Sequence, residues 1–180
     1  MWPRIRSFLR DNWVSLRVIT TFIGLIFAFF FLLTWEPIVS RVDAGAALAR
    51  LAAWMSYGIL KVLGWVIGYE IFRMGTIMGS GSFEVDVSPA CSGAVATTIY
   101  LSAVFAYPTS WRARWIGAAL GVTIIHLVNL GRVSALFLIG LYYHTIFHET
   151  HVYFAQALVV CVAVAVWVYW ASRFADAPAH

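Results

Sequence analysis

The stretch that decides the fold reads WIGAALGVTIIHLVNLGRVSALFLIGLYY, residues 115–143. It is longer than the roughly 20 apolar residues that a helix needs to cross a bilayer, and Arg132 is its one charged residue. A charge inside a membrane span is costly and usually serves a function. His126, Asn129 and Arg132 recur at one-turn spacing, so they share a polar face of the expected helix. The alternative is a structural arginine that snorkels outward or pairs with an acid such as Asp86.

The composition of the whole chain agrees with this membrane assignment. Of 180 residues, 62% are hydrophobic and 11% are charged, and the mean hydropathy is +0.84. A soluble domain is closer to about half apolar and about a quarter charged. The chain is therefore expected to be an integral membrane protein of one domain, residues 1–180. Its two cysteines are too few for a disulfide framework, and Cys161 lies inside an apolar run where an inert packing role is expected.

The basic residues follow an order that predicts the topology. They cluster before the first apolar span, in one short loop, and after the last span, so these segments are assigned to the cytoplasm. We expect an all-α integral membrane fold of about four transmembrane helices, with an outer interfacial helix and a short β-hairpin. The expected spans are residues 18–35, 91–108, 113–143 and 152–171. Residues 44–68 are expected to be interfacial or re-entrant, and residues 69–88 are expected to form an extracytoplasmic hairpin before the cysteine helix.

A second stretch, Ser-Pro-Ala-Cys-Ser-Gly at residues 88–93, carries a candidate nucleophile. It is expected to open the helix 91–108, and a helix N-terminus leaves backbone N–H groups unpaired and favours an anion. The thiolate form of Cys91 would be the nucleophile there. The small Ser92 and Gly93 leave the backbone open to a substrate carbonyl. The alternative is a small residue that fills space in a helix bundle.

Three chemically active residues are expected at one depth in the membrane. Cys91 lies about 17 residues, or roughly 25 Å, from the cytoplasmic turn at Pro108. Arg132 and His151 lie at similar distances from the cytoplasmic ends of their own helices. A thiolate, an imidazole and a guanidinium together suit acyl transfer at a peptide bond, as nucleophile, acid or base, and oxyanion stabiliser. The sequence therefore predicts a site near the outer edge of the hydrocarbon layer, with a hydroxyl or an amine as possible final acceptor.

The motifs Ala90-Cys91-Ser92-Gly93 and Asn129-x-x-Arg132-Val133, with a late histidine before the last helix, resemble the exosortase/archaeosortase family. The short chain and the run from His151 to Gln156 look most like the compact exosortase H branch. The resemblance implies a membrane cysteine transpeptidase, a cysteine protease that passes its product to an acceptor. It implies Cys91 as nucleophile, Arg132 as oxyanion stabiliser and one histidine as general acid or base. His151 is preferred for that role and His148, followed by Glu149, is the runner-up.

The same resemblance implies the substrates and the setting. The substrates would be membrane-anchored exported proteins with a C-terminal sorting signal, made of a short motif, a transmembrane helix and a basic tail. The enzyme would lie in the bacterial cytoplasmic (inner) membrane, with its site near the extracytoplasmic face and Ser92, Gly93 and Asn129 in supporting or substrate-binding roles. The acceptor is not identified, and no metal, organic cofactor or nucleic acid is implied.

Two other classes of function compete with this hypothesis. Five histidines, with His126 inside a helix and His151 at a helix end, would also suit a haem- or quinone-binding membrane protein. A non-catalytic membrane assembly factor is the third class, and in such a protein Cys91 would be freely replaceable.

Overall fold

The computed structural model describes residues 12–40, 43–81 and 83–175. Its long helices are α2 (Trp13–Thr34), α4 (Ala44–Ile67), α6 (Trp111–Tyr142) and α8 (Ala155–Arg173), each long and apolar enough to cross a membrane. The helix α5 (Ala94–Ala106) is apolar but shorter. Short helices α3 (Glu36–Val39) and α7 (His144–Glu149) join the longer ones. The expected class, a helical multi-pass membrane protein with about four spans, is confirmed.

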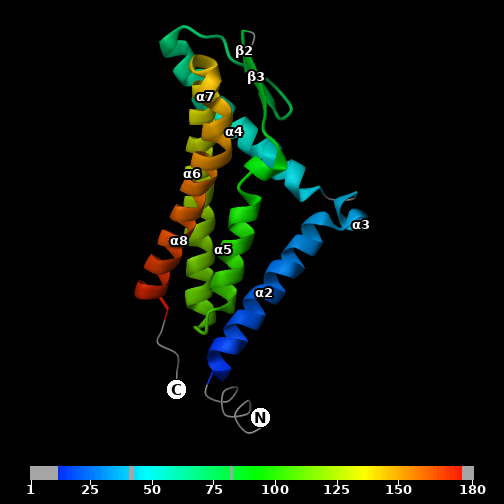
Figure 1. Cartoon of the computed structure of the whole chain (residues 1–180), viewed down its shortest axis with the longest axis vertical. Helices are drawn as coiled ribbons and strands as arrows, with labels where there is room; N and C mark the ends of the chain where they lie inside the picture. The colour runs from blue at the N-terminus through cyan, green and yellow to red at the C-terminus, as the bar shows by residue number, and fades with distance from the viewer. Residues whose placement is uncertain (1–11, 41–42, 82, 176–180) are drawn as a thin grey trace.

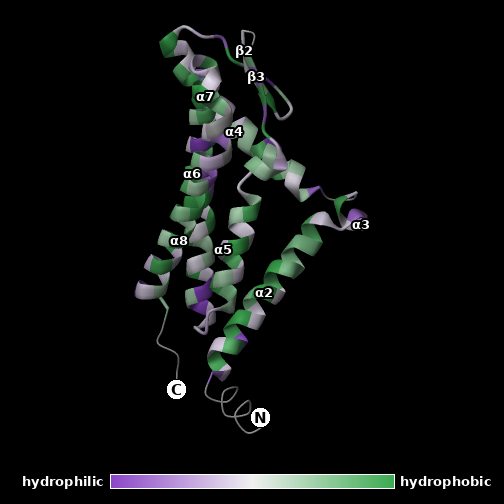
Figure 2. Cartoon of the chain, viewed as in Figure 1, coloured by the Kyte–Doolittle hydropathy of each residue, from purple (hydrophilic) through white to green (hydrophobic). Residues whose placement is uncertain are grey.

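The helices form a bundle with one oblique member (Figure 1). In Figure 1, α5, α6 and α8 run side by side, α2 lies inclined beside α5, and α4 crosses obliquely near the upper end. The first turn of α2 and the last turn of α8 lie toward the same, lower end, and the strands lie at the upper end. Figure 2 shows that the helices are mainly apolar along their length, with hydrophilic residues at α3 and at the lower end of α6.

The lower half of the bundle packs through glycines that face large rings. A Cβ added to Gly121 would lie 1.9 Å from the Tyr100 ring, and one added to Gly117 would lie 2.5 Å from the Trp170 ring. The two ring side chains also bond to α6, since Tyr100 Oη donates to the Gly117 carbonyl at 2.9 Å and Trp170 Nε1 donates to the Ala113 carbonyl at 2.8 Å. Small residues allow membrane helices to approach closely, and these contacts hold α5 and α8 against α6.

The strands form a three-stranded antiparallel sheet in the order β1-β2-β3. Its strands are β1 (Phe72–Met74), β2 (Ile77–Ser80) and β3 (Phe83–Asp86). A hairpin was expected over residues 69–88, but the segment has a third strand, because β2 lies between β1 and β3 and pairs with both. The chain reverses at Gly75 and Gly81, which adopt φ of +64° and +60°, a region that glycine enters at little cost.

Cys91 lies before its helix rather than at the helix start. Residues Pro89–Cys91 form one 3₁₀ turn, Gly93 takes a left-handed φ of +83°, and α5 begins only at Ala94. The segment between the expected spans 113–143 and 152–171 is also helical, because α7 continues through a π-helical turn, Thr150–Phe154, into α8. Helix α4 fills the expected segment 44–68, and the Asp43 carboxylate caps it by accepting from the Ala46 N–H at 2.8 Å. Its interfacial or re-entrant placement remains a prediction.

Candidate active site

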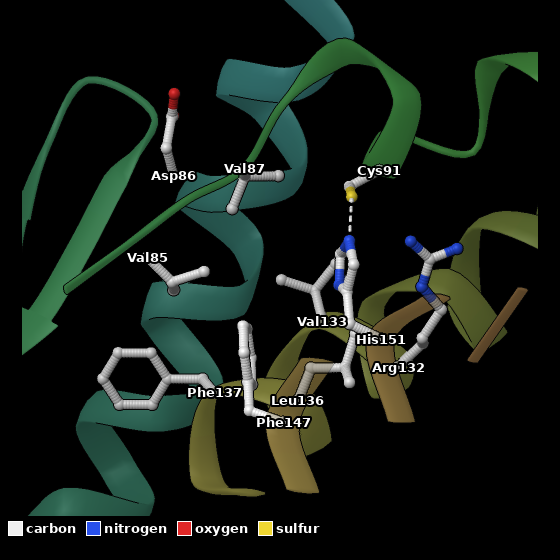
Figure 3. A pocket seen from close by; sticks show the side chains of 10 residues that line it. All are labelled: Val85, Asp86, Val87, Cys91, Arg132, Val133, Leu136, Phe137, Phe147 and His151. Atoms are coloured by element: carbon white, nitrogen blue, oxygen red, sulfur yellow. Dashed lines mark hydrogen bonds between the residues drawn. The ribbon is translucent and has the colours of Figure 1, made fainter. Parts of the chain in front are cut away.

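Cys91 and His151 form the centre of the site. The Cys91 Sγ lies 3.6 Å from the His151 Nε2, within hydrogen-bonding range for sulfur, although 60 residues separate them in the chain. The sulfur comes from the 3₁₀ turn above α5, and the imidazole comes from the π-helical turn above α8. Figure 3 shows the imidazole pointing directly at the sulfur. The Phe147 ring stacks on the imidazole with a centroid distance of 5.8 Å and helps to fix its orientation.

Arg132 borders the same small cavity. That cavity, of about 20 Å³, is lined by ten residues: Val85, Asp86, Val87, Cys91, Arg132, Val133, Leu136, Phe137, Phe147 and His151. Arg132 is only 6% exposed, and its Nη1 donates to the Gln156 Oε1 at 3.5 Å. Its Nε has no hydrogen-bond partner among residues 12–40, 43–81 and 83–175. The guanidinium thus retains hydrogen-bonding capacity beside the cysteine, as oxyanion stabilisation requires.

Asn129 fixes the backbone of the cysteine turn. It is 1% exposed, and its Nδ2 donates to the Cys91 carbonyl at 3.0 Å. Asn129 lies one turn before Arg132 on α6, so a single helix places the guanidinium and bonds to the cysteine turn. A Cβ at Gly93 would lie 3.3 Å from the Asn129 Cγ, so glycine here serves both the positive φ and the close approach to α6.

The Ser92 hydroxyl stabilises the cysteine turn by hydrogen bonds to the backbone. Its side chain is fully buried, its Oγ donates to the Pro89 carbonyl at 2.6 Å, and the same oxygen accepts from the Ala94 N–H at 3.2 Å. The hydroxyl therefore connects the 3₁₀ turn to the first residue of α5. This contact makes Ser92 a supporting residue of the turn.

The other candidate histidines are placed elsewhere. His126 Nε2 lies 3.4 Å from the Thr97 Oγ1, between α5 and α6. His148, the alternative acid or base, lies in α7, and its side chain is outside the part of the chain that the structure describes. Gln156 was not among the sequence-predicted site residues, although it ends the run from His151 that carried the resemblance. Spacing alone gave no sign of its contact with Arg132.

The fold and the site define a class: a multi-pass helical membrane protein in which a buried cysteine, a histidine and an arginine meet beside a small sheet. The model of one family, Transmembrane exosortase (Exosortase_EpsH), matches residues 14–170, a range that contains all three residues. The chain therefore belongs to the exosortase family, as its motifs predicted. No curated protein and no solved structure gives a significant match.

Proposed function

We propose that this exosortase-family protein is a membrane-embedded cysteine transpeptidase. It cleaves the C-terminal sorting signal of exported, membrane-anchored proteins and transfers the released acyl group from Cys91 to an acceptor. The observation that carries the proposal is the 3.6 Å contact between the Cys91 Sγ and the His151 Nε2, because a nucleophile within reach of its base is the signature of covalent catalysis.

The first half of the reaction forms a thioester. His151 accepts the proton of the Cys91 thiol, and the thiolate attacks the carbonyl carbon of the scissile peptide bond. Arg132 stabilises the negative charge that develops on the carbonyl oxygen. The C–N bond then breaks as His151 returns the proton to the leaving amine, and the substrate remains on Cys91 as a thioester.

The second half releases the product. A hydroxyl or amine acceptor loses its proton to His151 and attacks the thioester carbonyl. The C–S bond breaks, and the proton passes from His151 to the Cys91 sulfur, which restores the starting state. The buried setting of Cys91, which is 9% exposed, favours this transfer over hydrolysis because it limits the access of water.

The test is the processing of a tagged reporter, an exported protein from the same genome that ends in a hydrophobic helix and a basic tail. Co-expression with the wild-type enzyme shortens the reporter, whereas Cys91→Ala and Arg132→Ala each abolish shortening while the enzyme still accumulates. Cys161→Ala is the matched control, since Cys161 is the exposed cysteine and its replacement leaves processing unchanged. Normal processing by a stable Cys91→Ala variant would refute the enzyme hypothesis.

Trapping identifies the acid or base. In His151→Ala, the rate of thioester formation falls by roughly a hundred-fold or more, the usual contribution of a positioned proton-transfer group. Mass spectrometry of Cys91-linked substrate compares this variant with His148→Ala, which retains the wild-type rate. The reverse pattern would assign the role to His148.

The proposal also includes a location. The site faces the extracytoplasmic side of a bacterial cytoplasmic (inner) membrane, as the arginine distribution favours. A membrane-impermeant thiol reagent should reach a cysteine placed at Met74 in the sheet from outside intact spheroplasts, in a background without native cysteines. Labelling only after lysis would reverse this orientation.

A further inference from the structure

The last strand of the sheet has an open edge beside the active site. β3 pairs with β2 on one side, and within the described residues no strand pairs with its other side. It spans four residues, or about 13 Å at roughly 3.3 Å per residue. The chain runs directly from this strand into the turn that carries Cys91.

The alternation of hydrogen-bonded and non-hydrogen-bonded residue pairs between β2 and β3 shows which backbone groups face that edge. The Val87 N–H donates to the Thr76 carbonyl at 3.0 Å, and Val87 and Thr76 continue the register in which Val85 opposes Met78. In an antiparallel ladder, bonded and non-bonded pairs alternate. The backbone groups of Val85 and Val87 therefore point toward β2, and those of the intervening Glu84 and Asp86 point away from it.

Glu84 and Asp86 thus supply the free groups of the edge. The Asp86 carbonyl accepts from the Ser88 N–H at 3.1 Å. The Glu84 N–H, the Glu84 carbonyl and the Asp86 N–H point away from β2 and, among the described residues, make no backbone bond outside the sheet. The side chains of both residues are exposed, whereas Phe83 and Val85 turn toward the core.

This edge is continuous with the catalytic cavity. Val85, Asp86 and Val87 line the cavity together with Cys91 and His151. In Figure 3 the segment that carries Val87 passes above the His151 ring and leads to the sulfur. A chain whose carbonyl reaches the Cys91 sulfur can therefore lie alongside the end of β3.

An open strand edge can bind a peptide in the extended form that attack on a peptide bond requires. A peptide carbonyl inside a helix is bonded within its own chain and is shielded from a nucleophile, so the stretch around the scissile bond must be extended. An extended stretch that leaves water needs partners for its N–H and C=O groups. We propose that the substrate segment beside the scissile bond adds to the sheet as a fourth strand along β3. This inference rests on the proposed function and specifies how that site holds its substrate, by β-augmentation.

A proline at Glu84 tests the role of the edge backbone. Proline is tolerated on an edge strand where its missing N–H faces away from the ladder, so Glu84→Pro removes an outward donor and leaves the pairs with β2 intact. The assay uses purified full-length enzyme and a synthetic peptide spanning the cleavage region of the reporter. Glu84→Pro raises KM about five-fold or more, the equivalent of one lost hydrogen bond, with kcat within about two-fold. Glu84→Gln removes the same charge but keeps the N–H, so it raises KM less than Glu84→Pro does.

Two readouts separate this effect from a damaged fold. The alkylation of Cys91 by iodoacetamide, measured in a Cys161→Ala background, needs no strand pairing and stays unchanged in Glu84→Pro. N-methylation of the substrate peptide, one residue at a time, weakens processing at every second position, because alternate residues bond to the edge. Equal KM values for Glu84→Pro and Glu84→Gln, or an N-methyl profile without a two-residue period, would overturn the proposal.

Photocrosslinking tests the partner directly. A photoreactive benzoylphenylalanine at Asp86 in the inactive Cys91→Ala protein captures the reporter. The same group at Met74, which is 71% exposed on β1 at the opposite edge of the sheet, does not. Equal capture from Met74, or capture only of a second copy of this chain, would refute substrate pairing at β3. Failure of the wild-type enzyme to process the reporter would instead refute the proposed function.

Discussion

Replacement of Asn129 by leucine tests whether one hydrogen bond positions Cys91, the proposed nucleophile. Asn129→Leu keeps the size of the side chain but removes the Nδ2 donor that lies 3.0 Å from the Cys91 carbonyl. The Cys91 and Asn129 residues are both buried, so water cannot readily replace the lost donor. The variant should therefore disturb the turn that carries the sulfur without creating a cavity.

Two opposing effects set the magnitude. A buried carbonyl left without its donor costs about 1–3 kcal/mol. The Asn129 Oδ1 is itself buried and has no partner among the described residues, so its removal relieves part of that cost. We expect a net loss near 1 kcal/mol, which reduces the population of aligned Cys91 about five-fold.

The assay is the rate of thioester formation with the reporter peptide in purified full-length enzyme. Asn129→Leu lowers this rate about five-fold. The matched control is Ser134→Ala on the same helix, which removes a buried hydroxyl without a hydrogen-bond partner in the described part of the chain and leaves the rate unchanged. A wild-type rate in a well-folded Asn129→Leu protein would show that the bond does not position the turn.

Two further substitutions test other contacts. Gln156→Leu removes the acceptor of the Arg132 Nη1, and because that bond is long, at 3.5 Å, the rate of transpeptidation should fall only about two- to five-fold. Gln156→Glu keeps an acceptor and should retain the wild-type rate. Equal rates for the two variants would show that the Gln156 bond does not position Arg132. Gly121→Ala places a methyl group 1.9 Å from the Tyr100 ring, so the midpoint of thermal unfolding in detergent should fall, with a cost of about 1–3 kcal/mol or more from overpacking. Gly58→Ala on α4, where a Cβ meets no atom within 4 Å, should leave that midpoint unchanged or raise it.

The long apolar helices α2, α6 and α8 were predictable from the sequence because hydropathy and length alone define them. The expected span 113–143 corresponds to α6 at Trp111–Tyr142. The start of α5 was not predictable in the same way, because the left-handed φ of Gly93 interrupts the helix after Cys91. The strand β2 was also missed, since its residues Gly79 and Ser80 resemble a turn by composition. Glycine suits this position in the strand because the Phe72 ring fills the space that a side chain would need. A Cβ added to Gly79 would lie 2.4 Å from that ring.

The meeting of Cys91 with His151 was predictable from the helical rise, because each residue lies just before a helix, α5 or α8, and the two helices run side by side in the same direction. The rise per residue predicts how deep a residue lies in the membrane, but it does not predict the side of the helix on which that residue lies. The contact of Asn129 with the Cys91 carbonyl depends on that side, and so does the packing of Val87 against the site. Those features follow from the way the helices and the sheet pack, which the residue spacing does not contain.

The π-helical turn explains why α-helical periodicity does not predict Gln156 as a residue of the site. At about 100° per residue, His151 and Gln156, five residues apart, would lie roughly 140° apart around an α-helix, and both would not face one site. Residues Thr150–Phe154 instead close with i to i+5 bonds, which bring residues five apart to nearly the same side. One helix can therefore direct His151 toward the Cys91 sulfur and Gln156 toward the Arg132 guanidinium. The extra residue in this turn links the positions of His151 and of the Gln156 contact to Arg132, so a change in the turn would displace both together.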